Sequence, residues 1–163
     1  MPIPPLALLA LLAAQPAPAT ADPALVEVPQ MASAFRSICL EHLADAGAQA
    51  AVARATPWNF SPVGRAQDHT DRYRSNLGML GIRQAPQFCA LTAAVRPGVD
   101  VASFQAAMAA VLPLGPSSTL EAPDSVYWTI EADGGHDQYF IALKVSNHGG
   151  RVLATFTLQK RQS

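Results

Sequence analysis

The stretch that decides the fold is residues 126–160, which read VYWTIEADGGHDQYFIALKVSNHGGRVLATFTLQK. Three runs within it, 126–132, 139–146 and 152–160, alternate between apolar and other residues, and the sequences DGGHD and NHGG separate them. Such alternation is typical of half-buried strands, and Asp, Asn and Gly favour the tight turns between them. The segment is therefore predicted to form a three-stranded antiparallel meander.

The alternation also assigns the two faces of this meander. One face collects large apolar residues: Val126, Trp128, Ile130, Tyr139, Ile141, Leu143, Val145, Val152, Ala154, Phe156 and Leu158. The other face is mixed: Tyr127, Thr129, Glu131, Phe140, Ala142, Lys144, Leu153, Thr155, Thr157 and Gln159. The apolar face needs a cover of helices, whereas the mixed face is compatible with water, a shallow ligand site or a subunit interface.

Segments that can form this cover lie upstream. Residues 31–43 have apolar side chains at helical spacing, and the alanine-rich residues 47–55 favour helix by propensity. Asp100 can cap a third helix, which ends before Pro113. A strand is expected over 87–95. The order of helices, one or two strands, a helix and three strands predicts an α+β domain of two layers, in which helices cover one face of an antiparallel sheet.

The first 21 residues contain no charged side chain. Residues 6–14 are an apolar run with the length of a signal-peptide core, too short to span a bilayer, and Ala19-Thr20-Ala21 is a typical cleavage motif. We therefore predict a signal peptide over 1–21 and one α+β domain over 22–163. The mature protein is expected to be periplasmic or secreted, with no membrane insertion once the signal is removed.

The overall composition excludes some classes of function. The chain has 11 Lys and Arg against 12 Asp and Glu, a net charge of -1, so it lacks the basic surplus that nucleic-acid binding requires. With 50% hydrophobic residues it is also too apolar for a disordered protein. One globular domain without nucleic-acid binding is expected.

The chain has two cysteines, Cys39 and Cys89. In an exported protein such a pair normally becomes a disulfide, because the compartment is oxidising. The alternative is a nucleophilic Cys39 activated by His42, three residues later on the same face of a helix. The disulfide is the preferred prediction, since a catalytic thiol beside a second cysteine would be prone to oxidation.

Residues 58–76 are polar and show neither helical nor strand periodicity, which predicts a long loop, a feature that is uncommon unless functional. The charged residues of the chain are densest there, and Trp58 stands at the start. The candidate ligand-binding residues are Arg65, Asp68, His69, Asp71, Arg72, Arg74 and Trp58.

Four interpretations of this cluster remain open. Asp68, His69 and Asp71 have the atom types that bind a divalent cation, and Asp68 is placed to orient His69 as a general base. The arginines are suited to a carboxylate or phosphate. The fourth interpretation is a solvated surface loop in which opposite charges compensate each other.

Several short motifs resemble the small, exported, one-disulfide proteins of alanine-rich proteobacterial genomes. They are Phe35-x-x-x-Cys39-Leu40, an alanine-rich stretch that runs to Trp58, Phe88-Cys89, and the segment that begins at Asp100. The resemblance implies export and a disulfide-linked fold, and it implies no activity.

The chain carries none of the common catalytic signatures: no G-x-S-x-G, no S-x-x-K, no Gly-rich phosphate loop and no H-E-x-x-H. No cofactor or metal motif is present either. We therefore expect an exported, non-catalytic domain that binds a small ligand or a protein partner. The alternative is a metal-dependent or histidine-based hydrolase that uses residues 65–74.

Overall fold

The computed structural model describes residues 24–111, 118–119, 124–132 and 135–161. The predicted signal peptide therefore lies outside the described residues. In chain order the elements are α1 (Val28–Phe35), the π-helical turn η1 (Arg36–Leu40), α2 (Ala46–Arg54), β1 (Ser61–Arg65), β2 (Asp71–Ser75), β3 (Gly78–Arg83), β4 (Phe88–Val95), α3 (Val101–Val111), β5 (Ser118–Thr119), β6 (Ser125–Ala132), β7 (Asp137–His148) and β8 (Arg151–Lys160).

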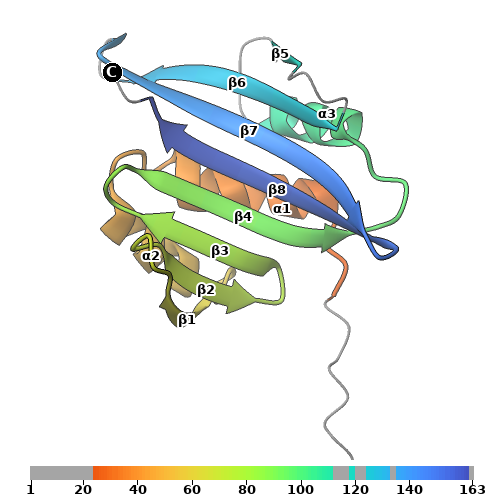
Figure 1. The fold of residues 1–163 in the computed structure, drawn as a ribbon, viewed down its shortest axis with the longest axis horizontal. Helices are drawn as coiled ribbons and strands as arrows, with labels where there is room; N and C mark the ends of the chain where they lie inside the picture. The colour runs from red at the N-terminus through yellow and green to blue at the C-terminus, as the bar shows by residue number, and fades with distance from the viewer. Residues whose placement is uncertain (1–23, 112–117, 120–123, 133–134, 162–163) are drawn as a thin grey trace, which may run out of the picture.

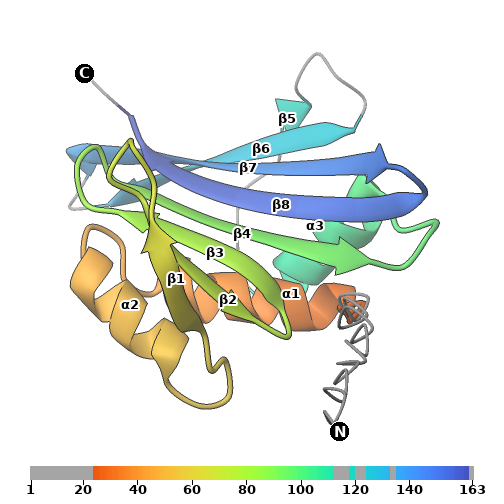
Figure 2. The ribbon, with the colours of Figure 1, turned by 60° about the horizontal axis from the view of Figure 1, so that its bottom comes forward.

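The strands form one antiparallel sheet of eight in the order β1-β2-β3-β4-β8-β7-β6-β5 (Figure 1). All three α-helices lie on the same side of this sheet (Figure 2), where α2 is next to β3, α1 next to β4 and α3 next to β7. The predicted α+β architecture and the C-terminal meander, now β6, β7 and β8, are confirmed.

The sheet consists of two meanders, β1–β4 and β5–β8, each preceded by helix. They meet where β4 pairs antiparallel with β8 over the full length of β4, from Phe88↔Gln159 to Val95↔Val152. The two halves are thus joined by a continuous ladder of backbone hydrogen bonds in the middle of the sheet, and one layer of helices covers both.

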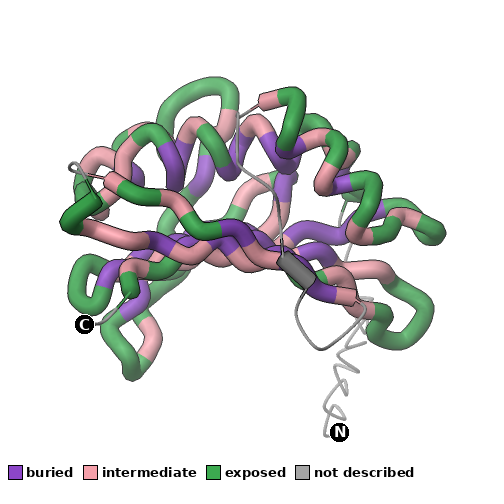
Figure 3. The backbone as a smooth tube through the Cα atoms, turned by 90° about the horizontal axis from the view of Figure 1, so that it is seen from above, coloured by how far each residue is buried: buried purple, intermediate pink, exposed green. Residues whose placement is uncertain are grey.

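The core lies between the helices and the sheet, where the buried residues are concentrated (Figure 3). Phe156 of β8 stacks on Phe35 of α1 with ring centroids 4.7 Å apart, and Phe104 of α3 meets it edge-on at 5.4 Å. These three rings connect both halves of the fold. Most residues of the predicted inward face of the meander are buried: Val126, Trp128, Tyr139, Ile141, Leu143, Ala154, Phe156 and Leu158.

The start of α3 follows the predicted capping arrangement. The Asp100 carboxylate accepts hydrogen bonds from the amide of Ser103 at 2.9 Å and from its hydroxyl at 2.8 Å. These bonds favour the ionised carboxylate and lower the pKa of Asp100.

The longest described helix, α3, has 11 residues, and no described helix is able to span a bilayer.

Cys39 and Cys89 form the predicted disulfide, with their Cα atoms 5.8 Å apart. Both are completely buried, and the bond ties η1 in the helical layer to β4 in the sheet. The sulfur of Cys39 is therefore part of a structural crosslink, and the alternative of a nucleophilic thiol activated by His42 is wrong.

The predicted long loop over 58–76 is wrong, because most of this segment forms the hairpin of β1 and β2. Four strands, rather than one or two, thus precede α3. The sequence of β1 and β2 lacks the alternating pattern of a strand because these two strands form the edge of the sheet. All five residues of β1 are exposed, and in β2 only Tyr73 is buried. Edge strands carry polar and charged residues without losing their pairing, so no apolar alternation develops.

Candidate ligand-binding groove

The charged residues of the predicted cluster lie on the β1–β2 hairpin. Arg65 and Asp71 face each other across its two strands, and their side chains form an ion pair with Nε and Oδ1 2.8 Å apart. Both side chains are largely exposed to solvent. This pair compensates its own charges, as expected for a solvated hairpin.

Asp68 stabilises the turn of the hairpin. Its carboxylate accepts hydrogen bonds from the Thr70 amide at 3.1 Å and the Thr70 hydroxyl at 2.9 Å, and it pairs with Nη1 of Arg83 at 2.9 Å. The two bonds from Thr70, aided by the positive charge of Arg83, hold the pKa of Asp68 below its usual value. The carboxylate is therefore used by the turn and by β3.

His69 follows Asp68 at an exposed position with φ of 64°, a left-handed conformation typical of tight turns. Within the described residues its imidazole makes no hydrogen bond, and the bonds of Asp68 go to Thr70 and Arg83 instead. No group of three His, Cys, Asp or Glu side chains in the described ranges is arranged to hold a metal ion. The hairpin thus does not place Asp68 to orient His69.

The remaining members of the cluster separate. Arg72 and Arg74 alternate with the buried Tyr73 along β2, so they lie on the helix-free face of the sheet. Trp58 is positioned by the loop after α2, on the helical side, and it packs against the core. The structure therefore brings Arg65, Asp68 and Arg72 to one open hollow of about 450 Å³ at the hairpin, but it does not gather all seven predicted residues in one pocket.

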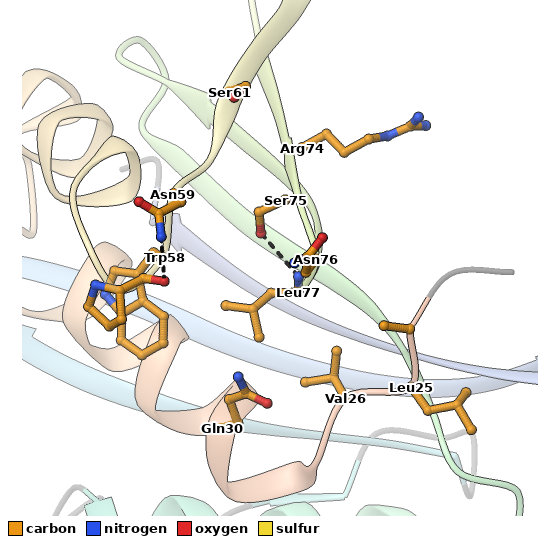
Figure 4. Close-up of a pocket in the computed structure, with 12 residues that line it drawn as sticks. Leu25, Val26, Gln30, Trp58, Asn59, Ser61, Arg74, Ser75, Asn76 and Leu77 are labelled. Carbon is orange, nitrogen blue, oxygen red and sulfur yellow. Dashed lines mark hydrogen bonds between the residues drawn. The ribbon is translucent and has the colours of Figure 1, made fainter. Parts of the chain in front are cut away.

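Trp58 instead borders a groove of about 490 Å³ (Figure 4). Of the predicted residues, only Trp58 and Arg74 line this groove. The groove lies between α1 with the segment before it, the loop after α2, and the turn between β2 and β3. Its lining residues are Ala24, Leu25, Val26, Gln30, Pro57, Trp58, Asn59, Ser61, Arg74, Ser75, Asn76 and Leu77.

The floor of the groove is apolar. Val26 and Leu77 are almost completely buried, and the half-buried Trp58 stands beside them. The backbone of Val26 is held in place because its amide donates to the carbonyl of Ala94 at 2.8 Å, in a short parallel bridge to β4. The segment before α1 thus forms a fixed wall of the groove.

The rim of the groove is polar. Nδ2 of Asn59 donates to the carbonyl of Pro57 at 3.1 Å, and Oγ of Ser75 accepts from the amide of Leu77 at 3.1 Å. The side chains of Gln30 and Asn76 have no hydrogen-bond partner among the described residues. Their amides are therefore available to a bound molecule.

Charge is nearly absent from this groove. None of its lining residues is acidic, and the one charged residue, Arg74, extends away from Trp58 toward the outside of the sheet (Figure 4). An indole beside apolar side chains, with amide groups above them, is suited to holding a molecule through both contact and hydrogen bonding.

Comparison with protein-family models, with curated proteins and with solved structures gives no match. Among the groove residues, Trp58 and Arg74 belong to the predicted cluster, whereas Gln30, Asn59 and Asn76 do not. These three come from separate segments, and only the pairing of β2 with β3 and the packing of α1 bring them together. No spacing within the chain marks them.

Proposed function

We propose that this protein is an exported, non-catalytic domain that binds a small ligand in the groove at Trp58. The observation that carries the proposal is the combination of an apolar floor with unpartnered amide groups at the rim. The groove exposes more polar than apolar surface, which favours a ligand held mainly by hydrogen bonds, with the ring of Trp58 as its apolar contact.

The ligand class follows from the lining. A suitable molecule has an apolar face that lies against the indole of Trp58, and hydroxyl or amide groups that reach Gln30 and Asn76. The groove has no carboxylate that would select for a cation. Its one arginine, Arg74, is directed outward, so the groove does not select for an anion either. We therefore propose an uncharged, polar ligand of a size that a volume of about 490 Å³ accommodates.

Export is the second part of the proposal. It is supported by the uncharged leader over 1–21 with its Ala19-Thr20-Ala21 motif, and by the buried disulfide, which is typical of proteins that fold in an oxidising compartment. Sequencing the N-terminus of the protein recovered from the periplasm or the medium tests this part. We expect the chain to begin at Asp22, and a chain that retains Met1 would contradict export by this signal.

Tryptophan fluorescence tests the binding site directly, because Trp58 lies at the groove and Trp128 is 4% exposed in the core. Libraries of neutral sugars, amides and short peptides are titrated against the protein and against Trp58→Phe and Trp128→Phe. We expect some of these compounds to change the fluorescence emission of the unchanged protein and of Trp128→Phe. The same compounds should leave the emission of Trp58→Phe unchanged. A response that persists in Trp58→Phe would place the binding elsewhere.

A further inference from the structure

The helix-free face of the sheet has a hollow of its own, with a volume of about 310 Å³, over β2, β3 and β4. Arg72, Gly81 and Ala90 are neighbours in one row across these strands, and Arg74, Met79 and Thr92 are neighbours in the next. The row through Gly81 and Ala90 has little side-chain bulk, so the larger side chains around it enclose an open space.

Gly81 contributes directly to this space. A Cβ atom at this position would approach the methyl group of Thr70 to 3.1 Å and the ring of Phe88 to 3.5 Å. Thr70 and Phe88 are both lining residues of the hollow. Any side chain at residue 81 would therefore occupy the hollow, which is open because this residue is a glycine.

The arginines around the hollow differ in their partners. Arg65 pairs with Asp71, and Arg83 pairs with Asp68. Arg72 and Arg74 have no carboxylate partner within the described part of the chain, although Nε of Arg74 donates to Sδ of Met79 at 3.4 Å. Arg72 lines the hollow, whereas Arg74 lines the groove at Trp58 and reaches the hollow only through its contact with Met79.

These two side chains are suited to one anion. Residues two apart on a strand point to the same face with their Cα atoms about 7 Å apart, a separation that two long arginine side chains readily bridge. Guanidinium groups bind carboxylates through pairs of hydrogen bonds. Asp68 also borders the hollow, but Arg83 and Thr70 already engage its negative charge.

Most of the remaining lining is apolar, with Met79, Phe88 and Ala90 beside Gly81, while the hydroxyl of Thr92 is bonded to that of Thr155 and Arg83 lies over the ring of Phe88 at 5.2 Å. We propose that the hollow binds a small carboxylic acid with an apolar body. Its carboxylate pairs with Arg72 and Arg74, and its apolar part lies over Gly81 and Ala90 toward the ring of Phe88. Apart from Arg74, which also lines the groove at Trp58, this site and that groove have different lining residues.

Calorimetric titration with three probes tests both halves of this proposal on the exported protein. Octanoate has the charge and the apolar chain, octanamide has the same chain without the charge, and acetate has the charge without the chain. We expect octanoate to bind, and octanamide and acetate to bind at least about tenfold more weakly, since each lacks one set of contacts.

Variants locate the site. The double variant Arg72→Gln/Arg74→Gln is expected to lower octanoate affinity at least about tenfold, whereas Arg54→Gln, which removes an exposed arginine on α2, leaves it unchanged. Ala90→Leu keeps both arginines but fills the hollow, and it is expected to abolish octanoate binding. Thermal unfolding confirms that each variant is folded.

Trp58→Phe is expected to bind octanoate as the unchanged protein does, which separates this site from the proposed function. The proposal is overturned if octanoate does not bind at millimolar concentration, if octanamide binds equally well, or if the double variant or Ala90→Leu retains full affinity.

Discussion

The two meanders of the sheet reach similar shapes by different means. In the central parts of β6–β8 every second side chain is apolar and faces the helices, so burial on one face stabilises each strand. In β1 and β2 a single side chain, Tyr73, is buried, and backbone pairing with each other and with β3, together with turn hydrogen bonds, stabilises the hairpin. Both candidate sites border this polar hairpin.

This difference has a physical explanation. The strands around β8 fill the centre of the sheet and leave little unoccupied space on its helical side. The hairpin of β1 and β2 lies at the edge, where α1 and the loop after α2 meet it without filling the gap, and the groove at Trp58 remains. Buried apolar contacts are thus concentrated in the central strands, and both candidate sites lie at the β1–β2 edge.

The largest effect on stability is expected in the apolar core at β8. Phe156→Ala removes the ring that contacts both Phe35 and Phe104, and it leaves a cavity in a completely buried position. We expect the free energy of unfolding to fall by about 3–5 kcal/mol. Urea unfolding followed by circular dichroism measures this change, and a loss below about 1 kcal/mol would show that these rings are not the centre of the core.

The next effect concerns the link between the helical layer and β4. Cys39→Ala/Cys89→Ala removes a crosslink between residues 50 apart in the chain. The expected loss of unfolding free energy is about 2–4 kcal/mol, because the unfolded chain gains freedom. Unfolding of the protein with and without a reducing agent provides the matched comparison, and equal stabilities of the two forms would contradict the assignment.

A smaller effect is expected in the hairpin turn, and it depends on pH. The pKa of Asp68 is lowered in the folded state, so its contribution is present above its ordinary pKa of about 3.8 and is lost as the pH falls through the lower folded value. Asp68→Asn is expected to destabilise the protein at pH 6, with the difference from the unchanged protein shrinking below pH 3.8. A difference that stays constant between pH 6 and pH 2 would exclude this carboxylate as the cause.

The smallest effect on stability is expected in β1, at the edge of the sheet. Val63 in β1 is 52% exposed and makes no core contact, so Val63→Thr is expected to change the free energy of unfolding by less than about 0.5 kcal/mol. Denaturant unfolding beside Phe156→Ala tests the contrast. A large loss at Val63 would show that the hairpin contributes far more to stability than its burial indicates.

The sequence predicts the C-terminal meander but not the hairpin of β1 and β2, because only the meander has one continuously buried face. Alternation of buried and exposed residues in 126–160 is a direct consequence of one-sided burial, and the Asp100 cap and the cysteine pair are equally local or chemically specific signals. β1 and β2 lack alternation because they obtain their conformation from strand pairing at an edge, which leaves no pattern of hydrophobic residues.

The candidate sites could be predicted only in part. Trp58 and the charged cluster stand out by composition, but Gln30 and Asn76 are ordinary surface residues until folding places them at one groove. Likewise, Arg72 and Arg74 differ from Arg65 and Arg83 only because the last two meet aspartates in the folded hairpin and β3. These distinctions depend on tertiary contacts between distant segments.

The central claim is that the groove at Trp58 holds a small ligand in the exported protein. A native mass spectrum of the protein isolated from the periplasm or medium of its producing cell tests it most directly. We expect the mass of residues 22–163 with one disulfide, plus a small-molecule adduct that is absent from Trp58→Ala. A ligand-free spectrum together with the failure of any small molecule to alter Trp58 emission, or an adduct retained in full by Trp58→Ala, would contradict the claim.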